Sequence, residues 1–375
     1  MIKAYEDLQD WLEGYAYDVW WGHGMDRECG GFFERLELDG SPTDDPKRAR
    51  LHPRQMFCFA QAARFGWRGP AREAVGHGLR FFLERYRRPD GFYRTLVARD
   101  GAAADDAALL YDQAFALLGL ASAYAMLAEP RIREAALELY ERLSSVLRRP
   151  DGGFEETVPP SVPLTSNSHM HLLEASLAWH ELEGDPRWLK LAAPIVELAL
   201  TRWIEPRGGA MREFFAADWQ PAADQGARAE PGHLYEWAWL LLRYGRCAGD
   251  VRIVPAALRL IEFGERFGVD PVRHVAINAC LDNGVPLDRA ARLWPQAERI
   301  KAGCLAGEMT GEPRYFGIAL EATRVLMSYF DTPLRGLWRD RLREDGRFVE
   351  EPAPASSFYH IVSAAAELKR VSELA

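Results

Sequence analysis

Residues 112–157 decide the fold, because they contain one complete structural unit. They include DQAFALLGLASAYAMLAE (112–129), IREAALELYERLSSVLR (132–148) and PDGGFEET (150–157). In the first two segments Ala, Leu and Glu recur at helical spacing, which predicts two helices. The third segment combines glycines with an aromatic residue, which predicts a short extended turn. One unit is therefore a helical hairpin followed by a Gly/aromatic turn.

The same unit recurs along the chain. Its other turns are CGGFFERLELDG (29–40), PDGFYRT (89–95), PRGGAMREFF (206–215) and EDGRFVEE (344–351), with VAINACLDNGVPLD (275–288) as a degenerate copy that lacks Gly-Gly. The spacing is about 60 residues, so each repeat is one supersecondary unit. Six helical hairpins that close into a ring predict an all-α fold, the (α/α)6 barrel, as a single domain over residues 1–375.

One helix of each predicted pair begins with polar residues. The six starts are RLHPRQMF (50–57), LLYDQAF (109–115), NSHMHLLEA (167–175), GHLYEWAW (232–239), WPQAERIK (294–301) and SFYHIVSA (357–364). In a ring of hairpins these six helices would surround the axis. The polar residues at their starts are then expected to converge at one mouth.

The composition excludes several classes of protein. Hydrophobic residues make up 48% of the chain and charged residues 27%, with a net charge of −9. Lys and Arg form no separate basic block, so a nucleic-acid surface is not expected. Five scattered cysteines without a CxxC pair predict reduced thiols in a cytoplasmic protein. The charged N-terminal segment predicts neither a signal peptide nor a membrane span.

Histidines gather at the predicted helix starts. His233 and Glu236 are three residues apart and share one helix face, and His171 and Glu174 repeat that spacing. His360 occupies the sixth start. Aromatic residues accompany these histidines, among them Tyr111, Trp237, Trp239, Trp294, Phe358 and Tyr359. Aromatic walls with a few convergent polar groups are typical of a sugar site, and histidines suit proton transfer near neutral pH.

Each of these residues also has a structural interpretation. A histidine at a helix start can simply bond a nearby carboxylate, and Arg54 can form an ion pair instead of holding a substrate oxygen. Glu298 can compensate the helix dipole. His169 and His171 point to different sides of a helix, and we expect His171 to be the functional one because it shares the His-x-x-Glu phase with His233.

Other chemistries remain open from the residues alone. Two His-x-x-Glu pairs could ligate zinc or iron, although no HExxH motif is present. A glycosidase would need two positioned carboxylates, for which Asp112, Glu236 and Glu298 are candidates. A non-catalytic sugar-binding or partner-binding toroid is a third possibility.

Taken together, the motifs resemble the N-acylglucosamine 2-epimerase family, which includes cellobiose 2-epimerases, mannose isomerases and sulfoquinovose isomerases. The segments that carry the resemblance are GGFFERLELDG (30–40), RLHPRQMFCFA (50–60), YDQAF (111–115), NSHMHLLEA (167–175), EPGHLYEWAWLL (230–241), RLWPQAE (292–298) and FYHI (358–361). They span nearly the whole chain in the family's order. The family fold is the (α/α)6 barrel.

The resemblance implies a role for each matching position. His233 and His360 match the two histidines expected to act as general acid and base. Arg54 matches the arginine that holds the sugar near its reacting end. The remaining residues implied to contact the substrate are Tyr111, Asn167, His171, Glu236, Trp294 and Glu298, with Glu236 orienting His233 or holding a hydroxyl group.

The implied reaction is aldose–ketose isomerisation of the mannose–fructose type through a cis-enediol. The alternative is 2-epimerisation of an N-acylhexosamine or of a disaccharide of the cellobiose type. The resemblance implies no cofactor and no metal, and we expect a monomer or homodimer that acts on a small sugar.

Overall fold

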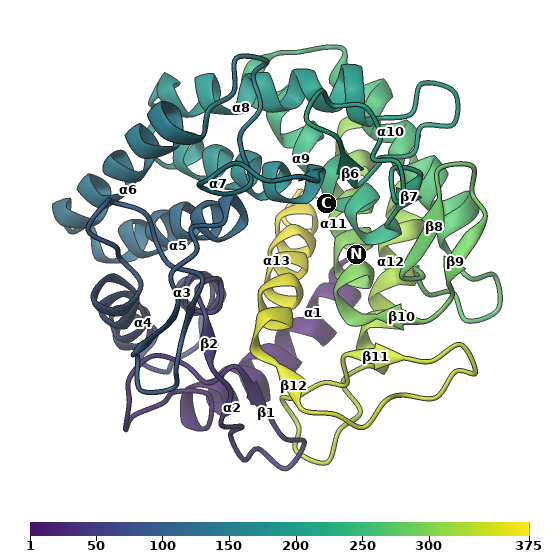
Figure 1. Cartoon of the computed structure of the whole chain (residues 1–375). Helices are drawn as coiled ribbons and strands as arrows, with labels where there is room; N and C mark the ends of the chain where they lie inside the picture. The colour runs from purple at the N-terminus through teal and green to yellow at the C-terminus, as the bar shows by residue number, and fades with distance from the viewer. Residues whose placement is uncertain (375) are drawn as a thin grey trace. The chain divides into compact units, whose positions relative to one another are not determined.

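The computed structural model describes residues 1–374 and contains two compact units. Of the described residues, unit 1 comprises 1–12, 196–351 and 360–374, and unit 2 comprises 13–195 and 352–359. Figure 1 labels the helices and strands of both units. The single domain expected from the sequence stays a prediction.

Unit 2 is built from three helical hairpins and short strands. Its helices are α2 (Tyr17–Gly22), α3 (Leu51–Phe65), α4 (Ala71–Arg85), α5 (Leu110–Leu127), α6 (Pro130–Arg142), α7 (Ser166–Glu183) and most of α8 (Pro186–Leu198). Its strands are β1 (Arg35–Leu36), β2 (Lys47–Arg48), β3 (Leu96–Val97), β4 (Ala103–Asp105), β5 (Leu164–Thr165) and β12 (Ala353–Pro354). α5 packs against both α3 and α7, while α4 and α6 cover them. β2, β3 and β4 form one antiparallel sheet, and β1 pairs with β12.

Unit 1 repeats the same plan. Its helices are α1 (Ile2–Trp11), α9 (Pro231–Ala248), α10 (Ile253–Phe263), α11 (Leu293–Thr310), α12 (Pro313–Ser328) and most of α13 (Ala355–Ser372). Its strands are β6 (Phe214–Phe215), β7 (Arg228–Ala229), β8 (Ala279–Leu281), β9 (Pro286–Asp288), β10 (Ala291–Arg292) and β11 (Arg341–Leu342). α9 and α11 lie side by side, with α10 packed on α9 and α12 packed on α11. Trp11 of α1 stacks on Phe330 at 3.8 Å between ring centroids.

The two helices of each hairpin differ in how they are buried. α5 is buried on nearly every side, from Leu110 to Ala123, whereas α6 buries one stripe that includes Ile132 and Leu139. The second type is the ordinary amphipathic surface helix. By length and composition α5 could also cross a membrane, but 72% of that window is buried inside the protein, as in a core helix.

Short π-helical segments follow several helices. They are η1 (Leu12–Ala16), η2 (Leu143–Leu147), η3 (Ala199–Trp203) and η4 (Gly264–Gly268). η2, η3 and η4 each precede a Gly/aromatic turn. The predicted helical hairpins with short hairpin-like loops are therefore confirmed within each unit.

A recurring hydrogen bond ties each of four turns to the helix that follows it. The backbone N–H pairs are Phe32 with His52 Nε2 (3.2 Å), Tyr93 with Gln113 Oε1 (2.8 Å), Phe154 with His169 Nε2 (2.9 Å) and Ala276 with Gln296 Oε1 (2.9 Å). Both glutamines also donate to the carbonyl of the same turn residue. The turn without Gly-Gly thus makes the same contact as the others, which identifies it as a true repeat.

Ala128, which follows α5, occupies a position that glycine takes after four other helices. The residues that follow α3, α7, α9 and α11 are glycines in the left-handed conformation, at 66, 184, 249 and 311. After α5 the same place is taken by Ala128, with φ 56° and ψ 29°. A side chain with a Cβ atom pays for this conformation in steric energy.

We expect Ala128→Gly to stabilise the protein by about 1 kcal/mol, because glycine adopts the left-handed region without strain. Thermal and urea unfolding measure the change. The matched control is Ala125→Gly, at an exposed position inside α5, which should destabilise by about 0.5–1 kcal/mol. Equal losses of unfolding free energy in Ala128→Gly and Ala125→Gly would contradict backbone strain at Ala128.

Candidate active site

His233 lies in the first turn of α9, where Glu230 is the N-cap residue and Pro231 begins the helix. Its side chain is 10% exposed. Nδ1 lies 3.0 Å from Glu213 Oε2 and 3.7 Å from Glu230 Oε2. The carboxylate bonded to the ring is therefore Glu213. Of the two roles that the resemblance implied for Glu236, orienting His233 or holding a hydroxyl group, the second stays a prediction.

The charge around His233 favours its protonated form. Burial alone would lower the pKa of His233, but the carboxylate of Glu213, with smaller contributions from Glu230 and Glu236, raises that pKa above its ordinary value. An opposite charge within hydrogen-bonding distance outweighs the burial. His233 is thus set up to hold a proton.

His360, on α13, bonds a carboxylate that also lies against a lysine. Its Nδ1 lies 2.6 Å from Glu298 Oε1, and the Glu298 side chain is 0% exposed. The second oxygen of that carboxylate lies 2.6 Å from Lys301 Nζ. Glu236 is also near, since its carboxylate, that of Glu298 and the His360 ring place atoms within 4.8 Å of one another.

Trp294 lies against both His233 and His360. The centroid of its ring lies 5.0 Å from that of His233 and 5.5 Å from that of His360. The indole can approach α9 because residue 232 is a glycine: a Cβ atom there would lie 2.4 Å from the Trp294 ring. Five of the residues predicted for the site (His233, Glu236, Trp294, Glu298 and His360) therefore form one cluster.

Unit 2 holds a second cluster, built around Arg54 of α3. Its Nη2 donates to the Tyr111 hydroxyl at 3.1 Å. The guanidinium carbon lies 4.2 Å from the ring centroid of Phe115 and 5.7 Å from that of Tyr359. Planar stacking on aromatic faces is a common arrangement for arginine, and it holds the guanidinium in a defined orientation.

His171 of α7 belongs to this second cluster. Its ring lies 5.0 Å from Tyr111 and 4.4 Å from Phe115, and Nδ1 lies 3.2 Å from Glu174 Oε2. The Tyr359 hydroxyl donates to the other oxygen of Glu174. His171 and Glu174 thus pair as the sequence spacing suggested.

The neighbouring His169 and Asn167 behave differently from each other. His169 bonds backbone atoms at both ring nitrogens, Thr165 O and Phe154 N, and burial lowers its pKa to about 4. Its role is structural, which supports the choice of His171. Asn167 lies in the first turn of α7, and within residues 1–374 its buried Oδ1 has no hydrogen-bond partner. That oxygen is available to a ligand.

Three residues of these clusters were not predicted from the sequence: Glu213, Lys301 and Phe115. Only Glu213 had a usable signal. It precedes His233 by 20 residues, the same separation that joins Tyr93 to Gln113 and Ala276 to Gln296. A search for carboxylates at that separation would have found it.

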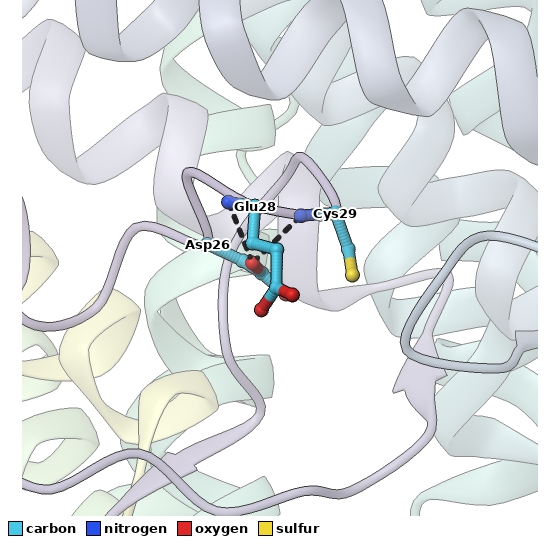
Figure 2. Close-up of side chains that lie close together, drawn as sticks. All are labelled: Asp26, Glu28 and Cys29. Atoms are coloured by element: carbon cyan, nitrogen blue, oxygen red, sulfur yellow. Dashed lines mark hydrogen bonds between the residues drawn. The ribbon is translucent and has the colours of Figure 1, made fainter.

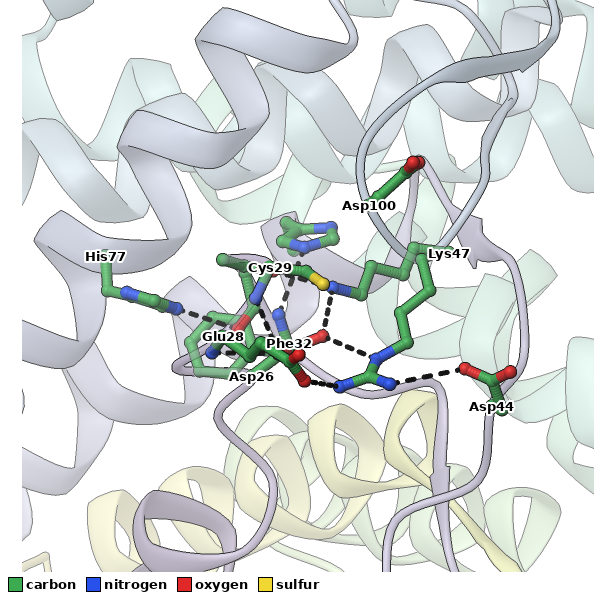
Figure 3. A network of polar contacts seen from close by, with 12 residues as sticks. Asp26, Glu28, Cys29, Phe32, Asp44, Lys47, His77 and Asp100 are labelled. Carbon is green, nitrogen blue, oxygen red and sulfur yellow. Dashed lines mark hydrogen bonds and ion pairs between the residues drawn. The ribbon is translucent and has the colours of Figure 1, made fainter.

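One acidic group outside these clusters is explained without a metal ion. Asp26, Glu28 and Cys29 place potential ligand atoms within 4.8 Å of one another (Figure 2). However, Lys47 Nζ lies 2.8 Å from Asp26 Oδ2 (Figure 3). Arg99 Nε lies 3.1 Å from the same oxygen. Two cations already neutralise this carboxylate, so the group is an ion-pair network that holds loops of unit 2 together.

Glu236, Glu298 and His360 could also approach a metal by distance alone. There the Lys301 ammonium lies against Glu298, and a lysine cation opposes a second cation at the same carboxylate. We assign no metal to this cluster.

Comparison with known proteins defines the class to which this fold and these clusters belong. A cellobiose 2-epimerase from Bacillus thermoamylovorans superposes with a TM-score of 0.90 over 100% of both chains, at 19% sequence identity. This likeness confirms the (α/α)6 barrel predicted from the six hairpins.

Residues 31–364 match the family model described as N-acylglucosamine 2-epimerase. The chain belongs to this family of sugar isomerases and epimerases. It is 44% identical to a mannose-6-phosphate isomerase from Rhizobium meliloti, over 97% of this chain and 96% of that one. It is 30% identical to a D-mannose isomerase from Thermobifida fusca, over 71% and 70%. The predicted family and enzyme class are confirmed.

Replacing Glu213 by glutamine should lower the pKa of His233, because the attraction of the carboxylate is lost while the burial that opposes the charged form remains. Histidine NMR titration measures this, with the resonance assigned by its absence in His233→Gln. Glu344→Gln, at a side chain 69% exposed, is the control and should leave the titration unchanged. An unshifted His233 titration in Glu213→Gln would contradict the assigned cause.

Proposed function

We propose that this protein is an aldose–ketose isomerase for mannose or a mannose derivative, and that His233 and His360 exchange the protons. The observation that carries the proposal is the contact of both histidine rings with Trp294, each ring bonded to a carboxylate through Nδ1. Such a bond fixes the ring orientation and places the proton on Nδ1 in the neutral form. Nε2 is then the nitrogen that serves the substrate.

The reaction needs one proton acceptor and one donor. The base removes the proton from C2 of the open-chain aldose, and that electron pair forms the C1–C2 double bond while the C1 oxygen accepts a proton. The resulting cis-enediol receives a proton at C1 as the C2 hydroxyl loses its own, which gives the ketose. An imidazole can both accept and donate a proton, so histidines suit these transfers. Trp294 offers its face to the sugar.

We further propose substrate-binding roles for Glu236, Glu298 and Trp294 in the first cluster, and for Arg54, Tyr111, Asn167 and His171 in the second. Arg54 is a suitable group to stabilise a developing enediolate oxygen, since it is charged and held by Tyr111 and Phe115. The proposed reaction uses no cofactor or metal. Five free cysteines support a cytoplasmic location, and a monomer or homodimer stays a prediction.

Two relatives named for mannose or mannose 6-phosphate support the isomerase. A 2-epimerase acting on an N-acylhexosamine or a disaccharide is the second candidate, because the matching family model bears that description. The two activities share the enediol. They differ in whether the proton returns to C1 or to the other face of C2.

An NMR time course in D₂O with EDTA present separates these candidates. Mannose and mannose 6-phosphate are each incubated with the protein, and we expect the ketose to form with deuterium at C1. A C2-deuterated epimer without ketose would establish the 2-epimerase instead. Loss of activity in EDTA would contradict metal independence, and absence of deuterium exchange with mannose, mannose 6-phosphate, N-acylhexosamines and cellobiose would contradict the enediol chemistry.

His233→Gln and His360→Gln should each lower kcat by about 10²–10⁴-fold, because each removes one proton-transfer group. Stopped time points with the same sugar measure this. His274→Asn is the control: its side chain is 56% exposed, and asparagine accepts its positive φ. Full turnover in either glutamine variant would contradict the role of that histidine.

A further inference from the structure

Lys301 is a buried lysine on the same helix as the proposed sugar-binding Trp294 and Glu298. It follows Glu298 by three residues, so the two side chains share one face of α11. The Lys301 and Glu298 side chains are both 0% exposed. Nζ lies 3.6 Å from the ring centroid of Trp239 on α9, which fixes the ammonium by a cation–π contact.

A buried lysine is costly and needs a compensating charge. Glu298 supplies that charge through one oxygen, and the other oxygen of the same carboxylate bonds His360 Nδ1. The Glu298 carboxylate thus lies between the Lys301 ammonium and the His360 imidazole, and its single negative charge interacts with both. The distances are 2.6 Å on each side.

The two histidines therefore have unequal surroundings. His233 faces the carboxylates of Glu213 and Glu230 at 3.0 and 3.7 Å. His360 faces Glu298, which is neutralised by Lys301, and Glu236. An ammonium beside the carboxylate weakens the attraction that this carboxylate exerts on a proton of the neighbouring ring.

We propose that Lys301 is a positioning residue that keeps His360 in its neutral, proton-accepting form by neutralising Glu298. His360 then begins the reaction as the base and His233 as the acid. The inference rests on the proposed function in using His360 for proton transfer. The coupling between Lys301 and His360 is a property of the free enzyme and is testable without turnover.

A purely structural lysine would stabilise the fold without changing the protonation of His360. Three variants separate the two roles by the sign of their effects. Lys301→Met leaves Glu298 uncompensated, so His360 should lose its proton at higher pH. Glu298→Gln leaves the ammonium, so His360 should lose its proton at lower pH. The double variant carries neither charge, so its His360 should lose its proton at a pH close to that of the unmodified protein.

The primary measurement is the NMR titration of His360, assigned by its absence in His360→Gln, from about pH 5 to about pH 9. We expect a shift of about one pH unit upward in Lys301→Met and downward in Glu298→Gln. The acidic limb of kcat/KM should move in the same directions. At a pH within that limb, Lys301→Met should lose about tenfold in kcat/KM, with a much smaller loss on the alkaline side.

Lys47→Met is the matched control, since Lys47 is also 0% exposed and pairs with a buried carboxylate, Asp26, at 2.8 Å. Lys47→Met should lower the melting temperature and leave the pH of the His360 titration unchanged. If Lys301→Met does not fold, Glu298→Gln and the double variant, which leaves no unpaired charge, still decide the question. Identical His360 titrations in those two variants would overturn the proposal.

These outcomes are distinguishable from failure of the proposed function. A shifted His360 titration without turnover of any sugar would retain the coupling and reject the isomerase. Turnover with an unmoved titration and an unmoved acidic limb in Lys301→Met would retain the isomerase and reject the role of Lys301.

Discussion

The hydrogen bond from a turn N–H to a side chain in the first turn of the following helix is the constraint on which the architecture depends. It occurs at Phe32–His52, Tyr93–Gln113, Phe154–His169 and Ala276–Gln296. A buried backbone donor must find a partner, and here the partner fixes where the helix starts relative to its turn. Residues two positions away along the helix, which include the proposed site residues Arg54, His171 and Glu298, are thereby held in place.

The same constraint explains which parts of the molecule could be predicted from its sequence. Helical periodicity and recurring glycines are local signals, and their repetition made the six hairpins readable. The histidines were harder, because one residue type serves two purposes: His169 holds backbone, whereas His171, two residues on, lies against Tyr111 and Phe115. Lys301 looked like an ordinary helix residue, because only packing against Trp239 reveals that it is buried.

The proposed reaction requires one histidine that donates a proton and one that accepts it. His233 and His360 lie against the same indole but bond different carboxylates. Glu213 lies 3.0 Å from His233, whereas Glu298 lies 2.6 Å from both His360 and the Lys301 ammonium. Since the imidazoles are chemically identical, the difference between acid and base has to come from residues that do not themselves exchange the proton.

Gly232 and Trp294 illustrate how closely such a site limits change. The space that a methyl group would need at residue 232 is filled by the indole of residue 294, on a different helix and far along the chain. A side chain at the first position requires a smaller ring at the second, and a smaller ring would withdraw the surface that both histidines share. A substitution at residue 232 therefore cannot be made alone: it also requires a change at residue 294, and that change removes the common surface.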